Sequence, residues 1–507
     1  MTASIHFQAT DRKAIDIGDG LIMRWSTSAD AANVASLVAK AFNWMPVEGP
    51  IPDGVTPGPN EFLRAAASRL LSGKNSTMSE FDYALVEDST VETGTNPIVA
   101  CAALHRLKAY YGSVDLFFGH PELIATQAEY RNKGLVRKLL LEMIHPESEA
   151  RGDALQFIHG LPHFYRQFGY EYAMCSFPPG TIRDIASIPA LMKGKVEPFR
   201  LRKATVEDIP RLVSMSSKEK VSPKTELGLY YSAEYWQYTV HDIFEIAQCK
   251  YDGDRDTMII LDATTGKDVG FTVVSHVFGM QVEAFSLDQN VLLAEALYPV
   301  LRQLIAIEKE RLVVKRQEEG EGSKTNTPGF PVKLALHPQH PAALLLGSRM
   351  TPGLIASAFR LYTRIPDYAK FIRMVGPELE KRLANSPMTG VTGRLRLDFY
   401  RKVEGSDHKG LEIIFRNGLI ESADGWARLL QEKALEEYLE WKAQDIVPVI
   451  YGAAFAPLTF TILLMGERSL EEIQFSFAET TVKDDNSRLL LNILFPKISH
   501  HMETFYW

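Results

Sequence analysis

Cysteine is scarce in this chain of 507 residues, which contains three: Cys101, Cys175 and Cys249. They are odd in number and far apart, so they provide neither a disulfide framework nor the close spacing of a metal site. We therefore expect buried thiols in a reducing compartment and no bound metal.

Long apolar runs are also missing. The longest apolar stretch, Ala453 to Met465, is too short to cross a bilayer and is interrupted by Pro457. Met1 to Lys13 are polar and charged, unlike the apolar segment of a signal peptide. The sequence predicts a cytoplasmic protein without a membrane span.

An excess of basic residues is absent too, because 55 Lys and Arg face 63 Asp and Glu, for a net charge of −8. This balance argues against a general nucleic-acid binder, although it leaves room for a local basic patch. The content of 46% hydrophobic and 23% charged residues is typical of a soluble globular protein. The length predicts about two to four domains.

The stretch from Pro121 to Arg137 carries the strongest signal. A short apolar run is followed by a polar turn, by Gly134 and then by apolar residues at helical spacing: Leu135, Leu139, Leu140 and Met143. This pattern predicts a strand, a tight loop and the start of a helix. A helix N-terminus with basic residues around a glycine suits phosphate oxygens, so we interpret the loop as a pyrophosphate cradle.

Two motifs in this region resemble those of the GNAT (Gcn5-related) N-acetyltransferases. The segment Arg131-Asn132-Lys133-Gly134-Leu135-Val136 resembles the family's acetyl-CoA pyrophosphate loop, with Val136 where the family prefers Gly or Ala. Further on, Phe164-Tyr165-Arg166-Gln167-Phe168-Gly169-Tyr170 resembles the other end of the same fold. Either motif alone is weak, but the pair at this distance is specific.

The resemblance implies acetyl-CoA as co-substrate and a set of cofactor contacts. The preceding strand would act through its backbone, so its side chains reveal little about the chemistry. The implied cofactor-binding residues are Leu123, Ile124, Thr126, Arg131, Asn132, Lys133, Gly134, Leu135 and Val136.

An internal repeat indicates a second copy of the same fold. Met23 to Asp30 is echoed by Leu201 to Asp208, and the echo continues from Val34–Leu37 to Leu212–Met215 at constant offset. The second copy has Asp288-Gln289-Asn290 where the first has its Arg and Gly. We expect it to have lost the cofactor and to wall the acceptor side of the first copy.

The last third of the chain combines helical and alternating patterns. One apolar helical face is followed by strand patterns, which predicts an α+β domain; the face consists of Tyr368, Phe371, Ile372, Val375, Leu379 and Leu383. The domain order resembles that of Eis-type acetyltransferases, whose third domain is similar to sterol carrier proteins. Ile365-Pro366-Asp367, Gly393 to Leu397 and Leu494 to Lys497 also resemble that family.

The predicted fold class is therefore α/β with mixed α+β character: two tandem GNAT folds followed by a sterol-carrier-like domain. The expected divisions are a catalytic domain over residues 1–176, a degenerate copy over 177–355 and the carrier-like domain over 356–507. A homo-oligomer is compatible with this organisation.

Tyr165 is the candidate general acid. In Eis-type enzymes the matching Tyr donates a proton to the departing CoA sulfur. A phenol with a pKa near 10 can protonate a thiolate of pKa about 8.5 only with little driving force, unless its site tunes it. The alternative role is that of a packed aromatic, which we also expect for Tyr170 and Tyr172.

Several groups are candidates for the general base. In Eis-type enzymes the chain's own terminal carboxylate enters the active site, which points to Trp507 here. An α-carboxylate, with a pKa near 3.5, is a weak base unless desolvated, so it would otherwise position the ammonium. The alternatives are the histidines His105, His120, His159 and His163.

The sequence thus predicts an N-acetyltransferase that moves an acetyl group from acetyl-CoA to a primary amine. The acceptor would be a small molecule, such as a polyamine or an aminoglycoside-like compound, or a lysine side chain. The alternatives are an acyltransferase that uses a longer acyl-CoA and a non-catalytic protein that binds acyl-CoA or lipid.

Overall fold

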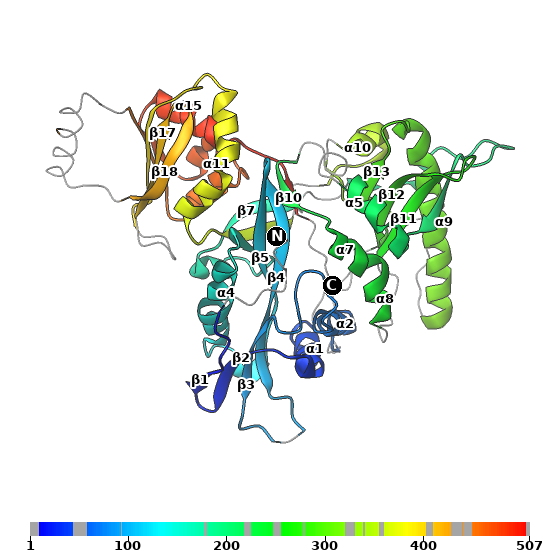
Figure 1. Ribbon diagram of the computed structural model, residues 1–507. Helices are drawn as coiled ribbons and strands as arrows, with labels where there is room; N and C mark the ends of the chain where they lie inside the picture. The colour runs from blue at the N-terminus through cyan, green and yellow to red at the C-terminus, as the bar shows by residue number, and fades with distance from the viewer. Residues whose placement is uncertain are drawn as a thin grey trace.

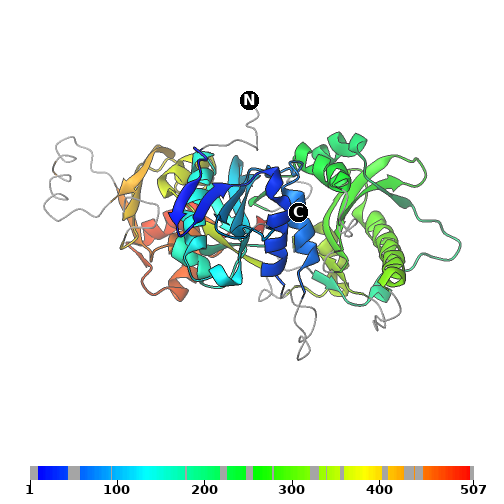
Figure 2. The same cartoon turned by 90° about the horizontal axis from the view of Figure 1, so that it is seen from below.

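The computed structural model describes residues 10–43, 58–92, 94–176, 180–216, 225–246, 255–276, 279–319, 330–337, 340–353, 359–401, 409–426, 439 and 449–502. Three β-sheets with flanking helices lie side by side, and the first of them stands between the other two in both views (Figures 1 and 2). The architecture is a mixture of α and β structure, as the alternating strand and helix patterns predicted.

The first sheet is built around a long hairpin. Strands β4 (Ile98–Tyr111) and β5 (Val114–Thr126) pair along most of their length. The order across the sheet is β1 (Ile15–Gly18), β2 (Leu21–Trp25), β3 (Tyr83–Asp88), β4, β5, β6 (Leu155–Ile158), β15 (Phe359–Arg364) and β7 (Glu171–Ser176). A turn at Gly112 and Ser113 joins β4, which ends at Tyr111, directly to β5.

Helices cover both faces of this sheet. On one face, α1 (Ala31–Ala41) and α2 (Glu61–Leu70) contribute to a core with Leu85, Cys101 and Leu123. On the other face lies one continuous helical segment, made of α3 (Leu135–Lys138), the π-helical η3 (Leu139–Ile144) and α4 (His145–Ala150). Its core includes Leu135 and Leu139, residues of the apolar face that the sequence predicted.

Five strands of the second sheet follow the order that β2 to β6 have in the first. Strands β9 (Phe199–Lys203), β11 (Arg255–Asp262), β12 (Asp268–Ser275) and β13 (Gln281–Leu287) are antiparallel neighbours, and β14 (Val332–Leu334) pairs parallel with β13. β8 (Gly180–Ile182) closes the sheet. The surrounding helical elements are α5 (Ile209–Met215), α7 (Ala233–Gln237), η7 (Tyr238–Asp242), α8 (Ile243–Glu245), α9 (Leu293–Glu319) and α10 (Pro341–Leu346).

The repeated sequence segments adopt the same local structure. Arg24 forms two hydrogen bonds to Asp30, of 2.8 and 2.9 Å, and Arg202 forms two to Asp208, of 2.6 and 2.7 Å. Each aspartate also closes a capping box with a threonine at the start of the following helix, at η1 (Ser28–Asp30) and at η6 (Val206–Asp208). The repeated sequence segments therefore form the same ion-paired helix cap at two places in the chain.

The third sheet has the order β18 (Leu419–Trp426), β17 (Gly410–Arg416), β16 (Gly393–Asp398), β19 (Ile450–Ala454) and β20 (Thr481–Val482). Helix α11 (Tyr368–Ala384) buries the predicted apolar face and continues through Pro377. Helices α13 (Thr459–Leu464), α14 (Leu470–Ser476) and α15 (Asp485–Leu494) complete this part.

Two distant segments join the first sheet. Strand β15 lies between β6 and β7, so residues just after 356 complete the first sheet before the chain enters the third. Near the end of the chain, β21 (His500–His501) pairs with β10 (Leu227–Leu229), which in turn pairs with β4.

Helix α9 is long and continues through a charged stretch to Glu319. No helix among the described residues is both long enough and apolar enough to cross a bilayer.

Candidate functional site

Strands β5 and β6 separate in the middle of the first sheet. Their parallel pairing covers Phe118 with Leu155 and Gly119 with Gln156. Beyond Gly119, β5 continues to Thr126, whereas β6 ends at Ile158 and pairs on its other side with β15. The edge of β5 that faces β6 is therefore available to a ligand, because a backbone without a neighbouring strand needs another hydrogen-bond partner.

A β-bulge shapes this free part of β5. Cys101 pairs with Ala125 but Ala103 pairs with Glu122, so Leu123 and Ile124 together face one residue of β4. Leu123 adopts a left-handed backbone conformation with φ 45° and is buried. A bulge re-aims the backbone groups of this stretch.

The predicted pyrophosphate loop follows β5 directly. After the turn η2 (Ala128–Tyr130), Asn132 and Gly134 have positive φ angles of 62° and 75°, and Gly134 caps the start of α3. Residues 131–134 are exposed, and an added Cβ at Gly134 would meet no atom within 4 Å. Elements α3, η3 and α4 run as one long helical segment, so its N-terminal N–H groups and its dipole favour an anion at this exposed loop.

Aromatic rings hold the basic residues at this loop. The Lys133 ammonium lies 4.5 Å from the centroid of Tyr130, whose hydroxyl donates to Asp88. The Arg137 guanidinium lies 4.9 Å from the centroid of Phe168. The second contact ties the loop to the segment that carries Tyr165.

Tyr165 lies in η4 (Phe164–Phe168), where its ring is buried in the same core as Leu135 and Leu139. Tyr362 of β15 packs on it with ring centroids 5.7 Å apart. An added Cβ at Gly160 would lie 2.0 Å from Tyr165 Cε2. The ring of Tyr165 is therefore held between Tyr362 of β15 and the backbone of Gly160.

The Tyr165 hydroxyl takes part in none of the hydrogen bonds between described residues. Burial raises the pKa of this phenol well above its usual value, so it stays protonated at neutral pH. It is better suited to donate a hydrogen bond to a developing thiolate than to lose its proton. In contrast, the Tyr170 hydroxyl bonds His145 and Gln156, at 3.0 and 2.9 Å, and Tyr172 stacks on Tyr362.

Three of the candidate histidines gather where the two strands separate. His105 on β4 is directly opposite His120 on β5, and their ring centroids are 5.7 Å apart. His159 lies just after β6, and its ring centroid is 5.9 Å from that of His120. Burial lowers the pKa of His105 and His159 to about 4 and that of His120 further, so all three are neutral at pH 7. His163 is exposed and lies outside this cluster.

Glu122 completes the histidine cluster. It follows His120 by two residues on β5, and its carboxylate lies 3.6 Å from His105 Nε2. The Thr77 hydroxyl donates to Asn75 and lies 2.7 Å from His105 Nδ1. Because that hydroxyl has a single hydrogen, we assign the His105 proton to Nδ1 and a lone pair to Nε2, toward Glu122.

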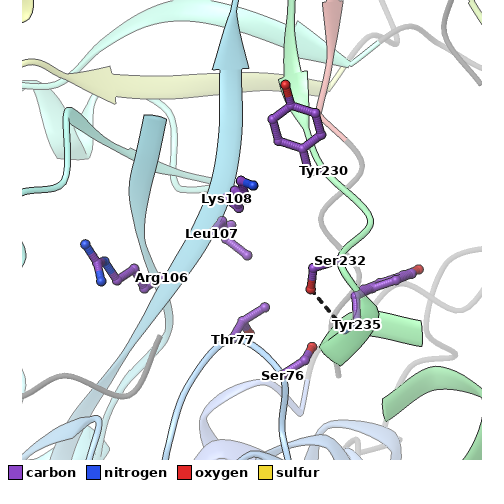
Figure 3. A pocket seen from close by; sticks show the side chains of 8 residues that line it. All are labelled: Ser76, Thr77, Arg106, Leu107, Lys108, Tyr230, Ser232 and Tyr235. Atoms are coloured by element: carbon purple, nitrogen blue, oxygen red, sulfur yellow. Dashed lines mark hydrogen bonds between the residues drawn. The ribbon is translucent and has the colours of Figure 1, made fainter. Parts of the chain in front are cut away.

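A small open cavity lies beside the cluster, between β4, the loop at Ser76 and Thr77, and the segment from Tyr230 to Tyr235 (Figure 3). Thr77 belongs to its wall and also holds His105, so the cavity is one hydrogen bond from the histidines. The Lys108 ammonium lies 3.7 Å from Asp115, which also accepts from Tyr230. The lining residues are Ser76, Thr77, Arg106, Leu107, Lys108, Tyr230, Ser232 and Tyr235.

The second sheet has a different loop after β13. Asp288 occupies the corresponding turn, and Arg211 forms an ion pair with it. A carboxylate at this position repels phosphate, in contrast to the basic loop of the first sheet. Trp507, the other candidate catalytic residue, lies outside the described residues.

Comparison with known proteins agrees with the fold. Residues 23–173 match the family model of the acetyltransferase (GNAT) domain, and they contain the separated strands, the basic loop and Tyr165. Such domains use acyl-CoA, and the protein is an acyltransferase. No curated protein matches the sequence.

Solved structures share the fold over nearly the whole chain. A GCN5-related N-acetyltransferase from Kribbella flavida is 14% identical with a TM-score of 0.57, and the match covers 96% of this chain and 100% of that one. A probable N-acyltransferase from Enterococcus faecalis V583 is 14% identical with a TM-score of 0.61, over 96% and 99%. Eis1 from Mycobacterium abscessus is 10% identical with a TM-score of 0.52, over 94% and 98%.

Sequence reasoning missed three parts of the site. Glu122 was not selected, although a carboxylate two residues from His120 on a strand must share its face. The contact of Gly160 with Tyr165 has no local signal in the sequence. Tyr362 reaches the site from a strand about 200 residues further along the chain, and only the folded sheet reveals this pairing.

Proposed function

We propose that this protein transfers the acetyl group of acetyl-CoA to a primary amine, of a small molecule or of a lysine side chain. The observation that carries the proposal is the convergence of four features at the separation of β5 and β6. They are the bulged strand edge, the basic loop at a helix N-terminus, the buried Tyr165 and the neutral histidine cluster.

In this proposal, each part of the acetyl-CoA molecule is bound by a different group of the protein. Exposed Arg131 and Lys133, together with the N–H groups before Leu135, would bind the pyrophosphate. The free edge of β5 would bind the pantetheine arm. Backbone N–H groups near Leu123 and Ile124 would stabilise the negative charge on the thioester oxygen as the amine attacks.

The histidine cluster would accept the proton of the amine. A buried site of neutral imidazoles with the Glu122 carboxylate attracts an ammonium, and burial lowers the ammonium's own pKa. After the neutral amine has attacked the carbonyl carbon, the nitrogen would lose a second proton and the C–S bond would break. The departing thiolate, stabilised by a hydrogen bond from the Tyr165 hydroxyl, would take up that proton as CoA leaves. The terminal carboxylate at Trp507 remains an alternative base.

The remaining parts of the chain would shape the acceptor side. We propose that residues 177–355 are a second GNAT-like copy without cofactor, which contributes Tyr230, Ser232 and Tyr235 to the cavity beside the cluster. We also propose that residues 356–507 are a sterol-carrier-like domain that supports the first sheet through β15 and β21. A cytoplasmic location fits a donor made and used in that compartment.

The test is a screen for CoA release over a panel of amines, with mass detection of the products. Polyamines, aminoglycoside-like compounds and lysine peptides should be compared, each with acetyl-CoA and with longer acyl-CoA. We expect a product that has gained one acetyl group. Tight binding of acetyl-CoA without CoA release on any amine would instead support a non-catalytic binding protein.

A further inference from the structure

Three side chains of the cluster have the arrangement of metal ligands. His120, Glu122 and His159 each present one ligand atom, and these atoms all lie within 4.8 Å of one another. His120 is completely buried, and the Glu122 side chain is 11% exposed. Two strands that diverge from a common point hold the three residues, His120 and Glu122 on β5 and His159 after β6.

The cluster contains more lone pairs than protons. Neither ring nitrogen of His120 has a hydrogen-bond partner among the described residues, nor does His105 Nε2, and all three atoms are buried. The ring of His120 is stacked on Phe157 with centroids 4.4 Å apart, which fixes its plane. A buried lone pair without a partner is unfavourable, so the site favours a ligand that accepts electron pairs.

We propose that His120, Glu122 and His159 bind a divalent transition-metal ion of the zinc class. Two imidazoles and one carboxylate, with a further position open, form a donor set that zinc uses in proteins. Ligands about 2.1 Å from one zinc ion lie at most about 4.2 Å apart, so atoms that lie within 4.8 Å of one another need at most a small adjustment. Glu122 and His159 are both partly exposed and can make this adjustment.

Metal binding has a consequence for the reaction, and this consequence rests on the proposed function. The metal would occupy the lone pairs that would otherwise accept the proton of the amine. Zinc should therefore inhibit acetyl transfer in competition with the amine, without displacing the donor from the basic loop. The binding of the metal does not depend on that function.

The experiment measures metal binding to the purified full-length protein. Titration calorimetry with Zn²⁺, in a buffer that does not chelate metal, should give one site per chain. Co²⁺ should produce visible absorption bands that Zn²⁺ abolishes. His120→Ala and Glu122→Gln should each weaken Zn²⁺ binding by more than about tenfold, a loss that even outer-shell partners cause in metal sites.

His163→Ala is the matched control, because His163 is exposed and outside the cluster. It should bind Zn²⁺ like the natural protein. Thermal melting identifies variants that fail to fold, and Glu122→Gln keeps the shape of the side chain if His120→Ala proves unstable. Absence of saturable binding, or binding that survives in folded His120→Ala and Glu122→Gln, overturns the proposal. If Zn²⁺ binds as described and no amine is acetylated, the metal site stands and the proposed function fails.

Discussion

Gly160 and Tyr165 are in direct contact, because an added Cβ at Gly160 would lie 2.0 Å from Cε2 and 2.4 Å from Cδ2 of the Tyr165 ring. Gly160 follows β6 and is exposed, whereas the ring is 6% exposed. The bare backbone at the end of β6 thus decides where the phenol hydroxyl lies relative to the separated strands.

The first prediction concerns this contact. Gly160→Ala should displace the Tyr165 ring and lower kcat by at least about tenfold, since small misplacements of catalytic groups are costly. Binding of acetyl-CoA, measured by calorimetry, should change little because the basic loop is untouched. Gly58→Ala is the control, since an added Cβ there meets no atom within 4 Å. An unchanged kcat in Gly160→Ala would show that the ring position is unimportant.

A second prediction separates chemistry from packing at Tyr165. Tyr165→Phe keeps the ring in its core and removes the hydroxyl, which makes no hydrogen bond among the described residues. We therefore expect unchanged melting and donor affinity but a kcat lower by about 100-fold, the cost of losing one hydrogen-bond donor to charge that develops in the reaction. Equal loss of melting temperature and activity would assign Tyr165 to packing instead.

The third prediction is that acetyl-CoA binds once per chain, at the loop before α3. Gly134→Asp should abolish binding in calorimetry, because it places a carboxylate where the pyrophosphate is expected. Gly134 has φ 75°, so the change also strains the backbone. Gly194→Asp is a matched control, since Gly194 has φ 79° and equally open surroundings. Two sites per chain, or binding that persists in Gly134→Asp, would contradict this assignment.

Local patterns in the sequence predicted the local parts of this architecture. The loop from Arg131 to Val136 and the repeated Arg and Asp of the two helix caps depend on residues close in sequence, so periodicity and spacing reveal them. The place of β15 between β6 and β7 depends on segments about 200 residues apart, which no local pattern encodes. The histidine cluster could be predicted only in part. The histidines can be read from the sequence, but the strand register that brings His105 opposite His120 appears only in the folded sheet.

The fourth prediction concerns stability in acid. Burial lowers the pKa of five histidines to about 4: His105, His159, His340, His500 and His501. In the unfolded chain they take up protons near pH 6.5, so stability should fall as the pH drops from about 6.5 to 4. The melting temperature should therefore be clearly lower at pH 5 than at pH 7.

One substitution tests that explanation. His340 Nδ1 accepts a hydrogen bond from the Ala342 N–H and caps α10, so protonation removes the cap. His340→Asn keeps a capping acceptor that does not titrate. It should melt like the natural protein at pH 7 and lose less stability at pH 5. His163→Asn, at an exposed position, should leave the pH dependence unchanged. Identical pH profiles for His340→Asn and the natural protein would exclude His340 as a contributor.

The last prediction concerns the end of the chain. Strand β21 is held by His500, whose Nδ1 accepts from the Cys175 N–H at 3.2 Å and whose Nε2 donates to the Met465 carbonyl at 2.7 Å. The Tyr231 hydroxyl lies 3.1 Å from His501 Nε2. These contacts hold the chain against the first sheet as far as Met502.

Removing residues 503–507 should therefore leave β21 and the melting temperature intact. If the terminal carboxylate acts on the amine, this truncation should lower kcat/KM for the amine while acetyl-CoA still binds normally. His500→Ala is the comparison, because it should lower the melting temperature by releasing β21. A truncated protein with full activity and normal melting would remove the carboxylate from the mechanism, and the proton of the amine would then pass to the histidine cluster.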